Sequence, residues 1–389
     1  MQKKKYNGEG TIYDVVKNGK KYYKAQISLG YDKNGKRIRK CFCGYNKTEV
    51  LKKMQQALFK YGVSTYSYDN ISFGDFFKDW LYNYKKIELK PNSFARYESL
   101  FRLKIQDYKI YKIKLRELNT RDIQRHLNEL INNNEISIEN GKRLITLIHS
   151  SLNFAIRQEY IYRNYAEGIV FPKIKKQVNN KVFSKEEQRL FIDHLNTKNT
   201  IDLLLLTAFC TGLRLGEITA LTWEDLKDGK LTINKQYQNE YKIDDYGNRT
   251  RELHLISTKT ESSERIIPLP DNILPLIFEH KKEQEKNINR LKGIYQDKKL
   301  IFADSIGNPI EHKKPNREVK KICKHINIPD RTFHSIRHSY ATRLFELNVP
   351  VKTVQHLLGH STINTTMNIY THVMEEQKTD EVQKLNKLL

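Results

Sequence analysis

The sequence contains little cysteine and no long apolar run. Only four of its 389 residues are cysteine, and they show neither a CxxC spacing nor a disulfide framework, which fits a reducing cytosol. The longest apolar stretch, residues 203–210, is interrupted by Thr207 and is far shorter than the roughly 20 residues that a membrane-spanning helix needs. The basic start, residues 1–5, is followed by no apolar segment, so we expect no secretory signal.

Acidic residues are scarce relative to basic ones. The chain has 45 Asp+Glu against 69 Lys+Arg, a formal net charge of +24. A surplus of this size indicates a polyanionic partner, and nucleic acid is the first candidate. Residues 1–62 hold 16 Lys+Arg and 4 Asp+Glu, which is half of the net charge in a sixth of the length. This asymmetry predicts a small basic module joined to more balanced domains, whereas a merely soluble lysine-rich surface would spread the excess evenly.

The basic module is expected to be a small sheet packed on one helix. Asn18-Gly19 and Asn34-Gly35 are hairpin-turn signals, and residues 22–29 between them alternate as in a half-buried strand. Residues 37–43 alternate as well, and Thr48 can cap the helix that follows. The Lys and Arg side chains on the open face could enter a DNA major groove, although the same pattern also fits a solvated basic sheet.

Residues 70–170 are expected to form four amphipathic helices with an aromatic core. Each helix begins near a capping residue or a proline: Ser72, Pro91, Thr120 and Ser137. A basic extended linker is expected at 171–183. Ser184 and Glu187 then form a capping-box signature that opens a last domain, residues 184–389.

The last domain carries basic residues in separate segments. Arg214 and Glu217 are three residues apart after an apolar helix, so on a second helix they would share a face. An arginine amid apolar residues is either salt-bridged to Glu217 as structure or aimed at a phosphate, and both interpretations stay open here. Lys259 would project from a hairpin within the strand-rich stretch 231–269, and alone it would be ordinary solvated surface.

Histidines and a tyrosine follow further along. His334 and Arg337 at positions i and i+3 of a helix would place an imidazole beside a guanidinium, a sensible clamp for a phosphate. An apolar helix over 351–358 ends at a glycine, His360 comes directly after it, and Tyr370 stands ten residues later. Taken alone, these residues fit half-buried structural positions. The histidines show no recognisable metal-ligand spacing, with no acidic or thiol residue among them, so we expect no metal site.

Six of these residues, taken in order, closely resemble the active-site series of the tyrosine recombinases, or phage-type integrases: Arg214, Lys259, His334, Arg337, His360 and Tyr370. The surrounding sequences match as well: TGLRLGE, the STKT hairpin, HSIRHSYAT and LLGHSTINTTMNIYTH. A basic module, a helical domain and a catalytic domain also resemble the layout of lambda-type integrases. The resemblance is strongest to the integrases of conjugative transposons.

The resemblance implies a multidomain α+β fold. A small three-stranded sheet plus helix would form an arm-site DNA-binding domain at 1–65, and a helical bundle would form a core-site DNA-binding domain at 70–170. The linker at 171–183 would lead into a tyrosine recombinase catalytic domain at 184–389, mainly α-helical with a small antiparallel sheet.

The resemblance also implies the reaction: DNA cleavage and rejoining that integrates and excises a mobile element such as a conjugative transposon. Tyr370 would attack the scissile phosphate and form a 3′-phosphotyrosine with a free 5′-hydroxyl. Two guanidinium forks, Arg214 and Arg337, would stabilise the charge that develops on the phosphate, and Glu217 would support Arg214.

The remaining residues would handle protons. Lys259 would protonate the departing 5′-oxygen, His334 would act as general base or proton carrier, and His360 would hydrogen-bond the phosphate. With cations supplied by side chains, this chemistry needs neither a metal nor ATP, so we expect no cofactor.

The expected partners are double-stranded DNA, bound at core and arm sites, and three further copies of the chain in a homotetramer on that DNA. Residues 375–389 would pack on a neighbouring protomer or form a frayed terminal helix. We also expect accessory DNA-bending and excision proteins. The expected location is the bacterial cytoplasm, with association with the nucleoid when the protein is bound, and no membrane partner is expected.

Two rival functions remain open at this point. Residues 351–369 could pass for the helix-turn-helix of a DNA-binding regulator without catalysis, although a regulator would not require Arg214, Lys259 and His334 far upstream. An enzyme like a type IB topoisomerase would use the same chemistry to relax DNA without site preference. The basic N-terminal module favours a site-specific assembly instead.

Overall fold

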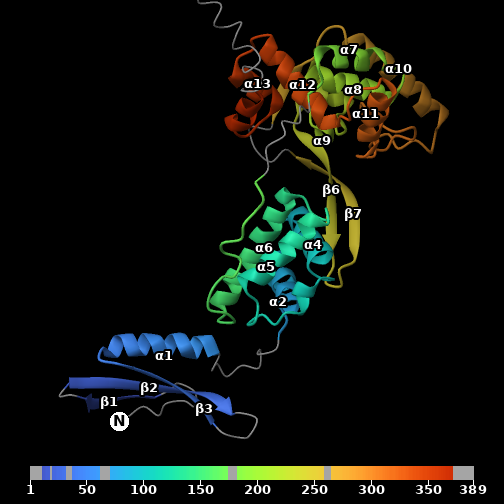
Figure 1. Ribbon diagram of the computed structural model, residues 1–389. Helices are drawn as coiled ribbons and strands as arrows, with labels where there is room; N and C mark the ends of the chain where they lie inside the picture. The colour runs from blue at the N-terminus through green and yellow to red at the C-terminus, as the bar shows by residue number, and fades with distance from the viewer. Residues whose placement is uncertain are drawn as a thin grey trace, which may run out of the picture. The chain divides into compact units, whose positions relative to one another are not determined.

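We describe the molecule from a computed structural model (Figure 1). The structure describes residues 11–17, 20–31, 37–61, 71–173, 182–257 and 264–370. The chain divides into two compact units, one of residues 1–175 and 241–250 and the other of residues 176–240 and 251–389. Within the described ranges, every helix is too short or too polar to cross a bilayer.

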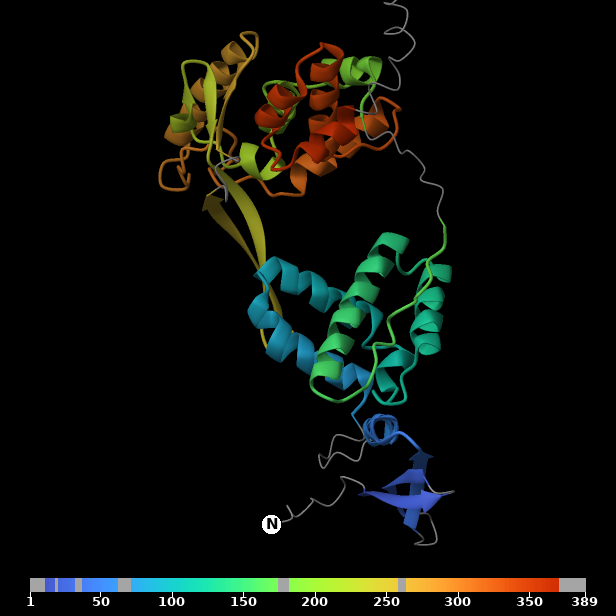
Figure 2. The same ribbon diagram turned by 90° about the vertical axis from the view of Figure 1, so that its left-hand side faces the viewer.

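The N-terminal module is a three-stranded antiparallel sheet with a helix on one face (Figures 1 and 2). Its elements are β1 (Thr11–Lys17), β2 (Lys20–Tyr31), β3 (Arg37–Gly44) and α1 (Lys47–Tyr61). Ala25 and Ile27 of β2 are buried against α1, so the strand alternation predicted from the sequence is confirmed. The two Asn-Gly turns lie outside the described residues.

The start of α1 differs from the expectation. Helix α1 begins at Lys47, and the side-chain oxygen of Asn46 accepts hydrogen bonds from the backbone amides of Thr48 and Glu49. Asn46 therefore caps the helix, and the prediction of Thr48 as the cap is wrong by two residues. Asparagine and threonine are both residue types that cap helices, so residue type alone does not decide between the two positions.

The rest of the first unit is a helical bundle. Its helices are α2 (Phe73–Asp79), continued by a π-helical turn (Trp80–Lys85) and α3 (Lys86–Glu88), then α4 (Pro91–Lys104), a 3₁₀ turn (Lys109–Lys112), α5 (Thr120–Asn132) and α6 (Ile138–Arg157). Ser72 and Ser137 cap α2 and α6 as predicted, while Asn119 rather than Thr120 caps α5. The aromatic side chains fill the core, where the rings of Phe77 and Phe101 stack at 5.5 Å. The predicted aromatic core is thus confirmed.

Two long strands, β6 (Lys235–Ile243) and β7 (Arg249–Ser257), form a hairpin whose tip belongs to this helical unit (Figure 1). Ile243 is buried in the core of the unit. Arg249 forms an ion pair with buried Glu98. Sequence reasoning assigned all of 184–389 to one domain and did not anticipate that residues 241–250 join the first unit.

The second unit is mainly helical. It contains α7 (Lys185–Asp193), α8 (Thr200–Thr211), α9 (Leu215–Ile218), a 3₁₀ turn (Trp223–Asp225), α10 (Leu274–Arg290), α11 (Lys314–His325), α12 (Phe333–Glu346), α13 (Val351–Leu358) and a helix over residues 363–370. Its small antiparallel sheet has the order β4 (Leu226–Lys227), β5 (Lys230–Ile233) and β8 (Arg265–Pro268). This mixed architecture confirms the predicted fold class.

Helix α8 lies at the centre of the second unit. It is apolar nearly all round, and α10, α11 and α12 pack against it. A helix with apolar residues on every face is stable in water only when other elements cover it. Gly212 ends α8 with a left-handed φ of 63°, and a Cβ there would lie 2.3 Å from the ring of Tyr340. This close turn sends the chain directly into the segment that carries Arg214.

Candidate active site

Arg214 and Glu217 form the first pair of the site. Arg214 stands just before α9, and both its backbone amide (2.9 Å) and its Nη1 (2.7 Å) donate to the Glu217 carboxylate. The Glu217 side chain is only 2% exposed, whereas that of Arg214 is 38% exposed. Arg214 therefore satisfies both interpretations of the sequence: it is salt-bridged, and it still has a surface that faces solvent.

Arg265, which sequence reasoning missed, is the second partner of Glu217. It opens β8, and its Nη1 and Nη2 donate to the two carboxylate oxygens of Glu217 at 3.2 and 2.8 Å. Burial disfavours ionisation of Glu217, but the hydrogen bonds and positive charge of Arg265, together with the charge of Arg214, outweigh burial and lower the Glu217 pKa to about 2. Glu217 is therefore a carboxylate at any physiological pH.

A pattern in the sequence could have found Arg265. In β8, Arg265 and Ile267 are buried while Ile266 and Pro268 are exposed, so the strand alternates with a period of two. That alternation places Arg265 on the same face as an apolar core residue. An arginine in such a position needs a buried acceptor, because an unpaired buried charge is very unfavourable.

Arg337 comes from α12 and is also buried. Its Nη1 donates to the carbonyl oxygen of Gly212 at 2.7 Å, and its Nη2 to that of Leu358 at 2.6 Å. Burial, and then the charge of Arg214, lower the Arg337 pKa to about 9. The guanidinium remains protonated at neutral pH, and a nearby anion would favour that protonated form.

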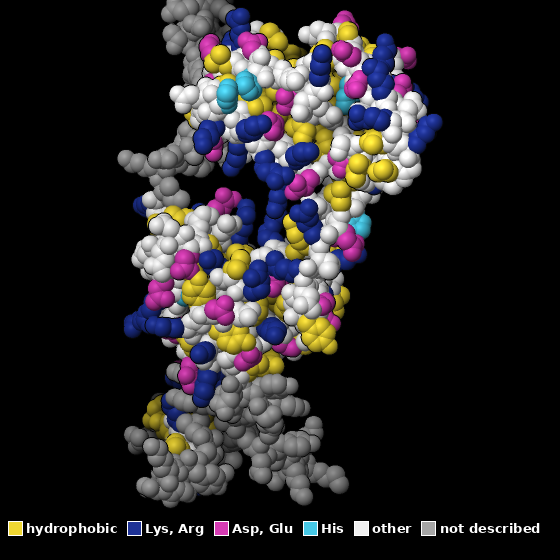
Figure 3. Space-filling model, turned by 90° about the vertical axis from the view of Figure 1, so that its right-hand side faces the viewer, with side chains coloured by type: hydrophobic (Ala, Val, Ile, Leu, Met, Phe, Trp, Pro, Cys, Tyr) yellow, Lys and Arg dark blue, Asp and Glu magenta, His cyan; other side chains and the backbone are white. Residues whose placement is uncertain are grey.

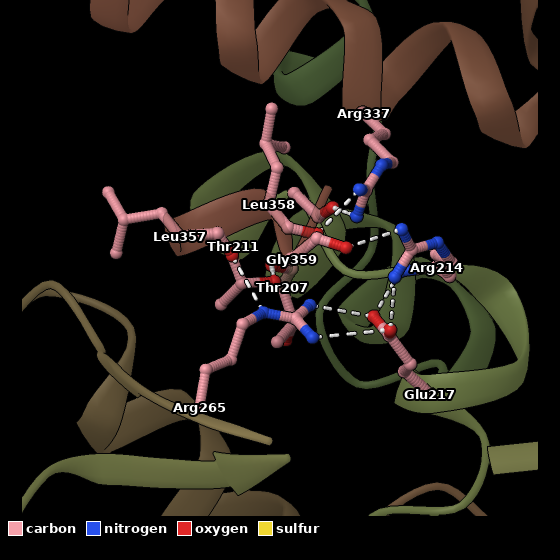
Figure 4. A network of polar contacts seen from close by, with 10 residues as sticks. Thr207, Thr211, Arg214, Glu217, Arg265, Arg337, Leu357, Leu358 and Gly359 are labelled. Carbon is pink, nitrogen blue, oxygen red and sulfur yellow. Dashed lines mark hydrogen bonds and ion pairs between the residues drawn. The ribbon is translucent and has the colours of Figure 1, made fainter. Parts of the chain in front are cut away.

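The three arginines meet at the C-terminal end of α13 (Figure 4). The last carbonyl groups of a helix have no partner within it and carry a partial negative charge. Here the oxygen of Leu357 accepts from Arg265 (2.8 Å), that of Leu358 from Arg337 (2.6 Å) and that of Gly359 from Arg214 (2.8 Å). Three cations from distant parts of the chain thus bind successive carbonyl groups of one turn.

Arg214 and Arg337 line a cleft of about 300 Å³ together with His334. The prediction that His334 and Arg337 lie side by side on one helix is thereby confirmed. His312 and Asn316, which sequence reasoning did not single out, complete the polar lining. His312 precedes α11 and Asn316 lies in its first turn. Neither belongs to a motif that the sequence analysis recognised, so only the folded chain places them here.

His360 follows the end of α13 directly. Its Nδ1 lies 2.9 Å from the hydroxyl oxygen of Thr366, a buried residue on the helix over 363–370. Burial, and then the positive charges of Arg337 and Arg214, lower the His360 pKa to about 3. The imidazole is therefore neutral at physiological pH and has one nitrogen that donates and one that accepts.

Tyr370 lies on the same helix as Thr366, one turn later. Its ring is half-buried and contacts Phe345 of α12, with ring centroids 5.1 Å apart and an interplanar angle of 70°. The other two predicted segments, Lys259 and residues 375–389, lie outside the described residues. Within the described part of the chain, no three His, Cys, Asp or Glu residues gather in a group that could hold a metal ion.

Lys and Arg side chains are numerous on the surface, interspersed with Asp and Glu (Figure 3). Two of the basic residues that form the site differ from these surface residues because they are buried. Arg265 and Arg337 are buried, and Glu217 is bound by Arg214 and Arg265, so the cluster of three arginines and Glu217 carries a net charge of +2. Such a cluster at the wall of a cleft attracts an anion.

Two family models match separate parts of the chain, and a curated relative matches nearly all of it. The model described as "Phage integrase family" matches residues 181–377, and that described as "Phage integrase, N-terminal SAM-like domain" matches residues 72–131. A protein of Caldanaerobacter subterraneus subsp. tengcongensis, named "Tyrosine recombinase XerC-like", is 35% identical over 96% of this chain and 98% of its own length.

The chain belongs to the phage integrase family. It is a site-specific recombinase of the tyrosine type. Solved integrases share its fold: the Tn1549 transposon integrase in complex with a circular intermediate DNA has a TM-score of 0.63 at 17% identity, covering 81% of this chain and 99% of that one. A lambda integrase tetramer bound to a Holliday junction has a TM-score of 0.55 at 18% identity, covering 90% and 95%.

Proposed function

We propose that this integrase cuts DNA with Tyr370 and rejoins it, integrating and excising a mobile element such as a conjugative transposon. The observation that carries the assignment of its residues is the cleft in which Arg214, Arg337 and His334 meet. A scissile phosphate in that cleft would face two guanidinium groups whose directions are already set by bonds to the α13 carbonyl groups. Such pre-set donors stabilise a transition state without reorganising during the reaction.

In the proposed cleavage step, one bond to phosphorus forms, another breaks, and one proton is transferred at each of the two oxygens. The hydroxyl oxygen of Tyr370 attacks the phosphorus and gives its proton to His334, and the bond from phosphorus to the 5′-oxygen breaks. Lys259 protonates that 5′-oxygen as it leaves. Rejoining is the same step in reverse with another 5′-hydroxyl as the attacking group, so the energy of the phosphodiester bond is retained.

The neutral state of His360 suits a donor to the phosphate. When the Thr366 hydroxyl donates to Nδ1, the proton of the ring stands on Nε2, which is then free to donate to a phosphate oxygen. The net charge of +2 from the three arginines and Glu217 provides the electrostatic attraction. His360 would add a hydrogen bond to it without adding a charge.

The domains would divide the DNA contacts. We assign arm sites to residues 1–65, core sites to 70–170, the linker to 171–183 and catalysis to 184–389. In β2, Lys24 and Gln26 alternate with the residues buried against α1 and therefore stand on the open face of the sheet. Lysine and glutamine are side chains that can donate to base edges in a major groove.

The proposed active form is a homotetramer on DNA, as in the lambda integrase tetramer bound to a Holliday junction. Residues 375–389 would pack on a neighbouring protomer, and accessory DNA-bending and excision proteins would set the direction of the reaction. We place this reaction in the bacterial cytoplasm, on DNA of the nucleoid.

The test is the covalent intermediate. Purified protein is incubated with nicked DNA from the ends of the element, and the products are separated by denaturing electrophoresis. We expect a band of protein joined to DNA that is absent in Tyr370→Phe and present in the control Tyr246→Phe, because the Tyr246 side chain is an exposed part of the hairpin tip. Absence of the band on any cognate site would favour a regulator, and relaxation of any plasmid without site preference would favour a topoisomerase.

A further inference from the structure

Arg265 stands at the centre of the arginine cluster but does not face the cleft. Its side chain is 0% exposed, in contrast to the 38% of Arg214. Its Nη1 and Nη2 donate to Glu217, and its Nε donates to the carbonyl oxygen of Leu357 at 2.8 Å (Figure 4). A guanidinium so enclosed cannot touch a DNA phosphate, so any part that it has in the reaction is exerted through its neighbours.

The first route runs through Glu217. The oxygen Oε1 of Glu217 accepts both from Arg214 Nη1 (2.7 Å) and from Arg265 Nη1 (3.2 Å). Because Arg265 holds the carboxylate by both oxygens, the carboxylate cannot rotate freely, and the Arg214 fork keeps one direction. Sharing the carboxylate between two cations also leaves Arg214 only partly neutralised, which favours its attraction to an anion.

The second route runs through the last turn of α13. Arg265 binds the carbonyl group of Leu357, and the next two carbonyl groups are the acceptors of Arg337 and Arg214. A shift of this turn would therefore move the acceptors of both guanidinium groups in the cleft. Gly359 leaves room for the contact, since a Cβ at that position would lie 2.8 Å from Arg265 Nη1.

We propose that Arg265 is a positioning residue, which orients Arg214 and Arg337 toward the scissile phosphate through Glu217 and the last turn of α13. The inference rests on the proposed function, because that function makes the phosphate the target of the two arginines. Arg265 contributes to the rate of cleavage and little to DNA affinity, since affinity comes from phosphate contacts spread along the whole site.

The test compares R265K with wild type on a half-site DNA that traps the covalent product. Lysine keeps the charge but lacks the fork, so it cannot hold both Glu217 oxygens and Leu357 together. We expect a dissociation constant for DNA within about threefold of wild type and a single-turnover cleavage rate about 10- to 100-fold lower, as for a misplacement of about 1 Å. A folded R265K that cleaves at the wild-type rate would overturn the inference.

The matched control is R331K. Arg331 also pairs with a carboxylate, donating to both oxygens of Glu187 at 3.2 and 3.0 Å, and its side chain is 10% exposed in the same unit. Its carboxylate partner is Glu187 and not Glu217, so R331K should leave the cleavage rate within about threefold of wild type. An equal loss of rate in R331K and R265K would mean that any weakened ion pair slows the enzyme, and the inference would be overturned.

Two further measurements separate positioning from folding. Because Arg265 acts in part through Arg214, the loss of rate in R214K/R265K should be smaller than the product of the two single losses, since coupled residues are not additive; fully additive losses would overturn the inference. A second variant, E217M/R265M, replaces the buried pair by apolar side chains, which can preserve stability. We expect the melting temperature of this variant to be near that of wild type and its cleavage to be slow. Fast cleavage would instead assign the pair a purely structural role. If wild type itself forms no covalent product with DNA, the proposed function has failed instead.

Discussion

Replacing Gly359 with alanine perturbs the cluster at its most crowded point. Gly359 has a φ of 63°, and the new Cβ would lie 2.8 Å from Arg265 Nη1 and 3.1 Å from its Cζ. Gly293 in the same unit has a φ of 83° with nothing within 4 Å of a Cβ. The two substitutions therefore share the backbone strain, and only Gly359→Ala adds the collision with Arg265.

The magnitudes follow from these two contributions. An L-residue in the left-handed region costs about 1 kcal/mol, which is the full expected effect of Gly293→Ala. In Gly359→Ala the guanidinium must also move, and each weakened hydrogen bond to a charged group costs about 1.5–3 kcal/mol. We expect a total loss of about 2.5–4 kcal/mol in the free energy of unfolding, or a melting temperature about 5–16 °C lower for a unit of this size. Cleavage should fall about 10- to 100-fold, because the Arg214 acceptor moves as well.

The assay uses the two tryptophans of the chain. Trp80 lies in the first unit and Trp223 in the second, so in a Trp80→Phe background the fluorescence of Trp223 reports unfolding of the second unit. Urea unfolding and single-turnover cleavage are measured for both glycine variants in this background. Equal stability losses for Gly359→Ala and Gly293→Ala would refute the reasoning, because the collision with Arg265 would then contribute nothing.

Three other predictions concern the hairpin, acid and proton transfer. Ile243→Ala should destabilise the first unit by about 2–5 kcal/mol, reported by Trp80 in a Trp223→Phe background, and leave the Trp223 transition of the second unit unchanged. The pKa of Glu217 is lowered from 4.5 to about 2. Its ionisation therefore adds about 3 kcal/mol to the free energy of unfolding above pH 4.5, and this stability is lost as the pH falls toward 2. The difference in free energy of unfolding between wild type and Glu217→Gln should shrink over that pH range. A difference that stays constant would contradict this prediction. Lys259→Ala should lose cleavage of ordinary DNA but retain it when sulfur replaces the leaving 5′-oxygen, since sulfur leaves without a proton; equal loss on both substrates would remove Lys259 from this role.

Local features of the fold were predictable because they depend on residues close in the sequence. The capping box of Ser184 and Glu187 starts α7 as expected, and Pro91 occupies the first position of α4. Where a prediction missed, as with Thr48 and Asn46, two residues of the types that cap helices stand two positions apart. A side chain that caps a helix bonds to backbone groups within four residues of its own position. The local sequence therefore contains nearly all the information needed to predict where a helix begins.

The site was predictable in part. The order of motifs identified the family, and the structure brings Arg214, His334 and Arg337 to one cleft, as that identification implies. The partnership of Arg265 with Glu217 was not predictable by the same means, since 48 residues separate them.

The sequence by itself determined the family, the basic character and the helices with their caps, because these depend on composition, ordered motifs and short-range periodicity. Only the tertiary structure decided that the hairpin tip at 241–250 joins the first unit and that three arginines meet the end of α13 around one carboxylate. The physical reason is that a buried charge needs a partner at hydrogen-bonding distance. Which distant residue provides that partner depends on how the helices and strands pack.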